Sequence, residues 1–187
     1  MAEHGFEIDW SELPTPEDDG AASHLTGRAM PALRLRATDG TDVALDGLRG
    51  VSVLYLYPMT GTPGVALPEG WNEIPGARGC TPQSCAYRDR FAELQAAGAD
   101  HVYGISTQSP DDQVAAAERL HLPFALLSDA DLALAHALKL PLFETSAGPH
   151  HKRMTLILRD GVIAEVFYPV FPPDADAGRV MDWLATP

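Results

Sequence analysis

The sequence contains few cysteines, few basic residues and no long hydrophobic run. Its formal net charge of −13 argues against binding to nucleic acid or to an acidic membrane, because phosphate contacts need clustered Lys and Arg. No apolar run approaches the length of a transmembrane helix, and the N-terminus shows neither the basic nor the apolar part of a secretory signal. We therefore expect a cytoplasmic protein without nucleic-acid or membrane partners. In that reducing compartment a lone cysteine pair is more typical of a catalytic, redox-sensing or metal site than of a permanent disulfide.

The length of 187 residues suits one domain with a full core. Residues 1–25 differ from the rest, since they carry many acidic side chains and contain no Lys or Arg. We predict an acidic N-terminal extension over 1–25, a solvated arm that Trp10 and Leu13 can pin to an apolar groove or to a second subunit. The domain then covers 26–187, as a monomer or a weak homodimer.

Hydrophobic periodicity predicts strands that alternate with helices, and hairpins at both ends of the domain. Residues 51–57 form a nearly continuous apolar run, which is typical of a central strand covered on both faces. These patterns indicate an α/β fold, a mixed sheet flanked by helices on both faces with an N-terminal hairpin. The predicted elements are a hairpin over 33–45, strands over 51–57, 101–106 and 124–127, helices over 80–98, from 110 and over 129–139, a hairpin over 155–167, and a last helix with Val180, Trp183 and Leu184.

The two cysteines lie five residues apart in Gly79-Cys80-Thr81-Pro82-Gln83-Ser84-Cys85, where a helix is predicted to begin. This proximity favours redox chemistry over a metal pair or two inert core thiols. Backbone N–H groups and the macrodipole at the start of the helix would stabilise a thiolate at Cys80. Residues five apart in a helix have Cα atoms about 8–9 Å apart, whereas a disulfide needs them within about 7 Å. Cys80 and Cys85 can therefore bridge only if the first turn and a half of the helix unwinds.

Four short motifs stand in and before this part of the chain: Tyr57-Pro58, Thr62-Pro63-Gly64, Gly79-Cys80-Thr81 and Cys85-Ala86-Tyr87-Arg88-Asp89. Together they resemble the active-site segment of the peroxiredoxins, and most closely that of the peroxiredoxin Q or bacterioferritin comigratory protein group. The resemblance covers about residues 30–185 and implies a thioredoxin-like fold. It also implies a thiol-dependent peroxidase that reduces hydrogen peroxide and organic hydroperoxides without a metal or an organic cofactor.

The same resemblance implies roles for individual residues. Cys80 is expected to be the peroxidatic thiolate that attacks the O–O bond and becomes a sulfenic acid. Cys85 is expected to be the resolving cysteine that condenses with it to an intramolecular disulfide, and a thioredoxin-type donor to reduce that disulfide. Arg153 matches the family's arginine beside the thiolate, and Pro58 and Thr62 match the residues that orient the peroxide.

The sequence departs from the family pattern between Thr62 and Cys80. The position at which the family spacing places the peroxidatic cysteine is Val65. We interpret 65–78 as an insertion loop, which forms a lid or an interface element near the thiolate. If this insertion loops outward, Thr62 or Thr60 can still reach the peroxide pocket; otherwise backbone amides orient the peroxide.

Two alternatives stay open at this point. One is a copper-binding, thioredoxin-like metallochaperone that uses Cys80, Cys85 and a His, although His150 and His151 suit a solvated loop better. The copper-delivery proteins have three residues between their cysteines, and this chain has four and no visible export signal. The other alternative is a thiol redox sensor that uses the same chemistry without turnover. The sequence does not determine the preferred peroxide, the physiological reductant or the oligomeric state.

Overall fold

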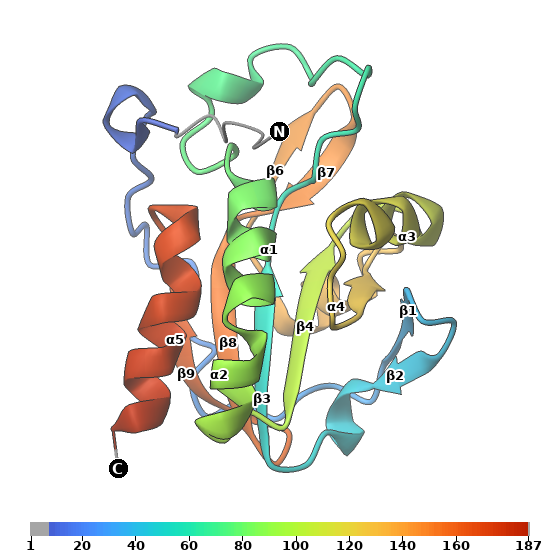
Figure 1. Ribbon diagram of the computed structural model, residues 1–187, viewed down its shortest axis with the longest axis vertical. Helices are drawn as coiled ribbons and strands as arrows, with labels where there is room; N and C mark the ends of the chain where they lie inside the picture. Colours follow the sequence, from blue (N-terminus) through green and yellow to red (C-terminus); the bar gives the residue numbers. More distant parts are fainter. Residues whose placement is uncertain (1–7, 187) are drawn as a thin grey trace.

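The fold is built on a seven-stranded mixed sheet, seen in a computed structural model that describes residues 8–186 (Figure 1). Its strands are β1 (Arg34–Ala37), β2 (Asp42–Ala44), β3 (Val51–Leu56), β4 (His101–Ser106), β5 (Leu126–Ser128), β8 (Met154–Arg159) and β9 (Val162–Phe167). They are arranged in the order β2-β1-β5-β4-β3-β8-β9. Strands β3, β4 and β5 run parallel, whereas β1 and β2 at one end and β8 and β9 at the other pair antiparallel.

Helices cover both faces of this sheet. One face carries α1 (Cys80–Asp89), α2 (Phe91–Ala96), α3 (Pro110–Arg119) and α5 (Asp176–Ala185), and the other carries α4 (Ala133–Leu138). The predicted mixed sheet with helices on both faces and an N-terminal hairpin, β1–β2, is therefore confirmed. Within residues 8–186, no helix is long and apolar enough to span a membrane.

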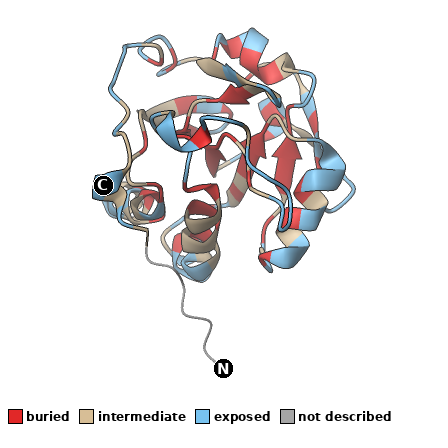
Figure 2. Cartoon of the chain, turned by 90° about the horizontal axis from the view of Figure 1, so that it is seen from above, coloured by how far each residue is buried: buried red, intermediate tan, exposed pale blue. Residues whose placement is uncertain are grey.

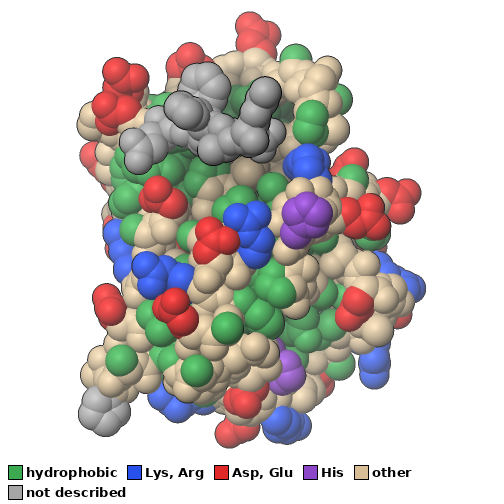
Figure 3. Space-filling view, viewed as in Figure 1, with side chains coloured by type: hydrophobic (Ala, Val, Ile, Leu, Met, Phe, Trp, Pro, Cys, Tyr) green, Lys and Arg blue, Asp and Glu red, His purple; other side chains and the backbone are tan. Residues whose placement is uncertain are grey.

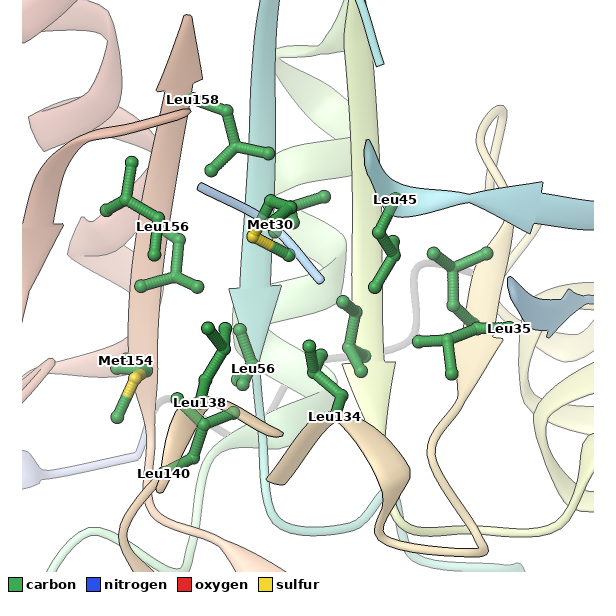
Figure 4. Close-up of a cluster of buried hydrophobic side chains, with 14 of the residues drawn as sticks. Met30, Leu35, Leu45, Leu56, Leu134, Leu138, Leu140, Met154, Leu156 and Leu158 are labelled. Carbon is green, nitrogen blue, oxygen red and sulfur yellow. The ribbon is translucent and has the colours of Figure 1, made fainter. Parts of the chain in front are cut away.

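Strand β3 is buried on both faces because its side chains alternate between two apolar clusters. Val53 and Tyr55 belong to the cluster under α1 and α5. Leu54 and Leu56 belong to the cluster on the α4 face, where Leu56 lies near Leu134 (Figure 4). Each buried Leu contributes about 1.5–3 kcal/mol of transfer free energy. Burial is accordingly concentrated on the strands, and the outer faces of the helices are exposed (Figure 2).

Most predicted elements are present with small shifts. The predicted helix start at Ser109 is confirmed, since its side chain accepts the N–H of Asp112 at 3.2 Å. The single helix predicted over 80–98 is two helices, α1 and α2, because Arg90 between them leaves helical geometry at φ −104° and ψ 7°. The strand predicted over 124–127 is β5, two residues later, and a shorter α4 replaces the helix predicted over 129–139.

A further hairpin, which was not predicted, consists of β6 (Leu142–Thr145) and β7 (Gly148–His151) and forms a separate two-stranded sheet. The expectation that His150 and His151 lie in a solvated loop is wrong, because their exposed fractions are 3% and 0%. His151 Nε2 lies 3.0 Å from Oδ2 of Asp129. The Asp129 carboxylate also accepts N–H groups at the start of α4, so it ties the hairpin to that helix.

The N-terminal arm, residues 8–21, runs along the domain beside α5 (Figure 1). Trp10 Nε1 donates to Oδ2 of Asp174 at 3.1 Å, and Lys152 Nζ donates to Oδ2 of Asp19 at 3.0 Å. The hydrogen bond from Lys152 is the largest of the causes that lower the pKa of Asp19 to about 2. The arm is therefore pinned to the domain at two places.

The packed core begins before the predicted domain boundary at residue 26. Ala22 and Leu25 are already buried among the apolar side chains on the α4 face. Residues 1–7, which carry Glu3 and Glu7 of the predicted acidic extension, lie outside the described residues. The described arm therefore meets the core at Ala22, four residues before the predicted boundary.

Gly104 in β4 provides a test of the packing between the sheet and the α1 face. A Cβ at this position would lie 2.6 Å from Cζ of Tyr55 and 2.7 Å from Cδ2 of Leu126. We expect Gly104→Ala to lower the free energy of unfolding by about 1–3 kcal/mol through overpacking. In the control, Gly178→Ala in α5, the new Cβ meets no atom within 4 Å, and the free energy should rise by up to about 1 kcal/mol. Urea denaturation measures both, and a Gly104→Ala variant as stable as the parent would contradict this packing.

Candidate active site

Cys80 is the first residue of α1 and lies at the positive end of that helix. The preceding Gly79 has φ 112°, a left-handed conformation that favours glycine. A Cβ on Gly79 would lie 2.6 Å from Cγ of Pro173 and 2.8 Å from Cη2 of Trp10. Glycine is therefore required both by the turn into the helix and by the close packing over its first residue.

The Cys80 sulfur is almost fully buried, with 4% of the residue exposed, and it is surrounded by polar groups. The N–H of Met59 donates to Sγ at 3.4 Å, and Nη2 of Arg153 donates to it at 3.2 Å. As a thiol, the same sulfur can donate to the carbonyl of Ala77, 3.7 Å away. Two donors and a helix N-terminus thus converge on the sulfur, an arrangement that can stabilise negative charge developing there.

Arg153 stands immediately before β8 and is 3% exposed, which excludes a solvent-facing role for its side chain. The two hydrogens of Nη2 are shared between the sulfur and three carbonyls within hydrogen-bond distance, those of Gly76 and Ala77, both at 3.2 Å, and of Arg78 at 3.4 Å. Its Nη1 donates to Oε1 of Gln83 in α1. The guanidinium therefore joins the end of the insertion, helix α1 and the sulfur. The sequence did not predict these carbonyl acceptors, because every residue has a backbone carbonyl and no pattern of side chains indicates which one will accept a hydrogen bond.

Cys85 lies within α1 and is half-buried, and both cysteines are free thiols. Burial raises the pKa of the Cys85 thiol, while the charge of Arg88 opposes that rise. The two sulfurs thus differ in environment: Cys80 is surrounded by hydrogen-bond donors, and Cys85 is held in its neutral form. The intact helix between them agrees with the prediction that a disulfide requires unwinding.

The structure does not bring Thr62 to the sulfur. Thr62 is exposed and lines a separate cavity of about 510 Å³. Thr60 is buried, but its N–H and its hydroxyl both donate to Oε1 of Gln108, at 3.0 and 3.2 Å. Pro58 is buried and directly precedes Met59, whose N–H faces Cys80. Of the groups considered for orienting the peroxide, namely Thr62, Thr60 and backbone amides, a backbone amide is the one that contacts the sulfur.

The insertion over 65–78 has an exposed half and an anchored half. Val65 and Leu67 are 65% and 43% exposed. Trp71 is 4% exposed, and its ring packs edge-on against His150 with centroids 5.2 Å apart. The anchored half leads directly to the carbonyls that bind Arg153, so this part of the insertion belongs to the wall of the site.

These features define a class of protein: a mixed sheet flanked by helices, with a buried thiol at the N-terminus of a helix packed on it, is a thioredoxin-like thiol protein. The Redoxin family model matches residues 25–181. Chloroplastic peroxiredoxin Q of Populus jackii is 34% identical over 162 residues, covering 84% of this chain and 67% of that protein. The corresponding protein of Gentiana triflora is 31% identical over 183 residues, covering 93% and 75%.

A solved structure supports the same conclusion. The crystal structure of peroxidoxin BcpB from Mycobacterium tuberculosis matches with a TM-score of 0.68 and 27% identity, covering 86% of this chain and 97% of that one. The chain therefore belongs to the redoxin family and, within it, to the peroxiredoxin Q and bacterioferritin comigratory protein group of peroxiredoxins.

The contact between Arg153 and Cys80 predicts a loss of thiol reactivity when the guanidinium is removed. In a Cys85→Ser background, so that only Cys80 reacts, we expect Arg153→Met to slow alkylation by iodoacetamide at pH 7 by about tenfold or more. The reason is that a hydrogen bond to a charged group is worth about 1.5–3 kcal/mol. Arg90→Met, at an exposed arginine outside the site, is the control and should leave the rate unchanged. Equal rates for the two variants would show that the guanidinium does not activate the sulfur.

The anchored half of the insertion predicts that Trp71 supports the site from a distance. We expect Trp71→Ala to lower the free energy of unfolding by about 3–5 kcal/mol and to slow alkylation of Cys80, because the loop that holds Arg153 loses its anchor. Leu67→Ala, in the exposed half, should change stability by no more than about 0.5 kcal/mol. Urea denaturation and the alkylation assay measure both effects, and a stable Trp71→Ala variant would refute this anchoring.

Proposed function

We propose that, in this thiol-dependent peroxidase, Cys80 is the peroxidatic residue, Cys85 the resolving residue and Arg153 the cation that stabilises the reacting sulfur. One observation carries the assignment of residues: the buried sulfur of Cys80 lies at the N-terminus of α1 with the Arg153 guanidinium 3.2 Å away. Membership in the peroxiredoxin family supports a peroxide as substrate and a thiol as reductant.

In the first half of the proposed cycle, the Cys80 thiolate attacks one oxygen of a hydroperoxide. An S–O bond forms while the O–O bond breaks, so sulfur is oxidised to a sulfenic acid. The second oxygen leaves with the electron pair of the O–O bond, takes up a proton and departs as water or an alcohol. Arg153 is placed to donate to the oxygen on which negative charge develops, and the N–H of Met59 supplies a second donor.

In the second half, the Cys85 sulfur attacks the sulfenic sulfur, a disulfide forms, and the hydroxyl group leaves as water. The step requires α1 to unwind between the two residues, since an intact helix holds them too far apart. Unwinding would also expose Cys85 to water and so remove the burial that raises the pKa of its thiol. A thioredoxin-type dithiol then reduces the disulfide by exchange.

The two cysteines predict different phenotypes. We expect Cys80→Ser to abolish peroxide reduction, because the nucleophile is lost. We expect Cys85→Ser to retain the first oxidation but to lose recycling by thioredoxin, and its Cys80 to be overoxidised to sulfinic acid. Stopped-flow oxidation followed by mass measurement of the products distinguishes these species. A Cys85→Ser variant that is recycled by thioredoxin as fast as the parent would remove Cys85 from the mechanism.

The alternatives differ from this proposal in measurable ways. A redox sensor would be oxidised once per chain without sustained peroxide consumption by the thioredoxin system. The copper-binding alternative is not favoured, since the chain belongs to the peroxiredoxins. In the described part of the chain, moreover, no three His, Cys, Asp or Glu side chains form a cluster suited to a metal.

The surface charge of the chain bears on its partners. On the face shown in Figure 3, the Lys and Arg side chains of the described residues are interspersed with acidic ones. This mixture supports the proposal that the chain does not bind nucleic acid. A cytoplasmic location and a monomer or weak homodimer stay predictions, and the plant relatives named above are chloroplastic proteins.

We further propose that the exposed half of the insertion is a lid or an interface element. The exposure of Val65 and Leu67 supports this role, because large apolar side chains that face water favour contact with another surface. A Val65→Ser/Leu67→Ser variant with unchanged peroxide turnover and unchanged association state, measured by sedimentation, would contradict it.

A further inference from the structure

Asp176, the first residue of α5, is a fully buried carboxylate that the peroxidase cycle does not use. Three donors converge on its Oδ2: Nε2 of Gln83 at 2.9 Å, the hydroxyl of Tyr87 at 2.7 Å and Oγ1 of Thr155 at 2.7 Å. These donors come from α1, which begins with Cys80, and from β8, which directly follows Arg153. Burial raises the pKa of Asp176, and the hydrogen bonds from Thr155, Tyr87 and Gln83 oppose that rise. The carboxylate is thus held between the helix and the strand of the site.

The carboxylate of Asp176 determines which end of the Gln83 side chain faces Arg153. A glutamine amide has a donor end and an acceptor end, and Oδ2 of Asp176 is an acceptor, because the hydroxyl groups of Tyr87 and Thr155 donate to it. Because Nε2 of Gln83 donates to Asp176, its Oε1 is directed to the other side, where it accepts from Nη1 of Arg153. The opposite orientation would place the amide N–H donors of Gln83 against the N–H donors of the guanidinium. It would also place the amide oxygen against the carboxylate of Asp176, where neither group can donate to the other. Gln83 is itself 0% exposed, so water cannot compensate for a wrong orientation.

The orientation of Gln83 in turn directs the guanidinium toward the sulfur. The guanidinium is planar and rigid, so a hydrogen bond at Nη1 also restricts the direction in which Nη2 points. Nη2 lies 3.2 Å from Sγ of Cys80. We propose that Asp176 is a positioning residue for the peroxidatic thiol, which acts through the Gln83 amide to hold Arg153 against Cys80. This inference rests on the proposed function of Cys80 and Arg153, and it assigns Asp176 no contact with the peroxide.

Alkylation by iodoacetamide tests the proposal without peroxide, so its outcome does not depend on whether the chain turns over as a peroxidase. In the Cys85→Ser background, we expect Asp176→Leu to slow alkylation of Cys80 at pH 7 by about tenfold, comparable to losing one charge-assisted hydrogen bond. Asp176→Asn can keep an oxygen acceptor at the same place, and we expect it to restore the rate to within about threefold of the parent. Wild-type reactivity in a folded Asp176→Leu variant would overturn the proposal.

A double-mutant cycle separates positioning from a merely structural role. Gln83→Met cuts the chain of contacts at its middle while leaving Asp176 in place, and we expect it to slow alkylation about as much as Asp176→Leu. If Asp176 acts through Gln83, then adding Asp176→Leu to Gln83→Met should slow the reaction by no more than about twofold further, because coupled residues are not additive. Fully additive losses would overturn the proposal.

The control is Ser84→Ala, because Ser84 lies in α1 next to Gln83 and is equally buried. The Ser84 hydroxyl is bonded to the hydroxyl of Tyr55 at 3.1 Å and lies outside this set of contacts. We expect Ser84→Ala to lower the urea midpoint but to leave the alkylation rate unchanged. If Asp176→Leu does not fold, the Gln83→Met variant tests the proposal by itself. A folded Gln83→Met variant whose Cys80 is alkylated at the parental rate would refute the role of the amide, and with it the role of Asp176.

Discussion

The contact between the Arg153 guanidinium and the Cys80 sulfur is the interaction on which the rest of the site depends. It joins residues 73 positions apart, one at the head of β8 and one at the head of α1. A buried cation is costly unless its donors are satisfied, and here the carbonyls of 76–78 and the amide of Gln83 supply acceptors. The insertion and α1 therefore supply acceptors for Nη1 and Nη2 of the buried arginine, whereas its Nε has none among the described residues. The guanidinium is placed to stabilise negative charge on the sulfur.

The same helix must hold Cys80 in place and later release it. The far part of α1 is firmly anchored, since Tyr87 stacks on Tyr55 with ring centroids 4.3 Å apart and donates to Asp176. The first turn carries the polar contacts of Cys80 and Gln83. Unwinding a turn and a half from the N-terminus can therefore leave the anchor at Tyr87 intact. This division of α1 reconciles a preorganised thiol with a disulfide that forms within one helix.

The predictions from the sequence were wrong where the local composition of a segment favoured one structure and its packing against distant residues favoured another. The segment 141–151 contains two prolines and a glycine, a composition typical of a loop, yet it forms the β6–β7 hairpin because His150 and His151 are buried against Trp71 and Asp129. Thr62 obeys a family spacing, but it is exposed and lines a cavity whose lining does not include Cys80. By contrast, β3 was predictable because burial on both faces leaves a continuous apolar run in the sequence itself.

The sequence alone determined that one thiol begins a helix and that a second follows one and a half turns later, because helix starts and residue spacing are local properties of the chain. It also determined the alternation of strands and helices, and through the motif around Cys80 it indicated the family. Only the tertiary structure decided which groups surround the sulfur. The N–H of Met59, the carbonyls of 76–78 and the side chains of Arg153, Gln83 and Asp176 come from segments that meet only when α1, α5 and the sheet pack together. A pattern of neighbouring residues cannot specify such contacts, since they depend on where distant segments lie in space.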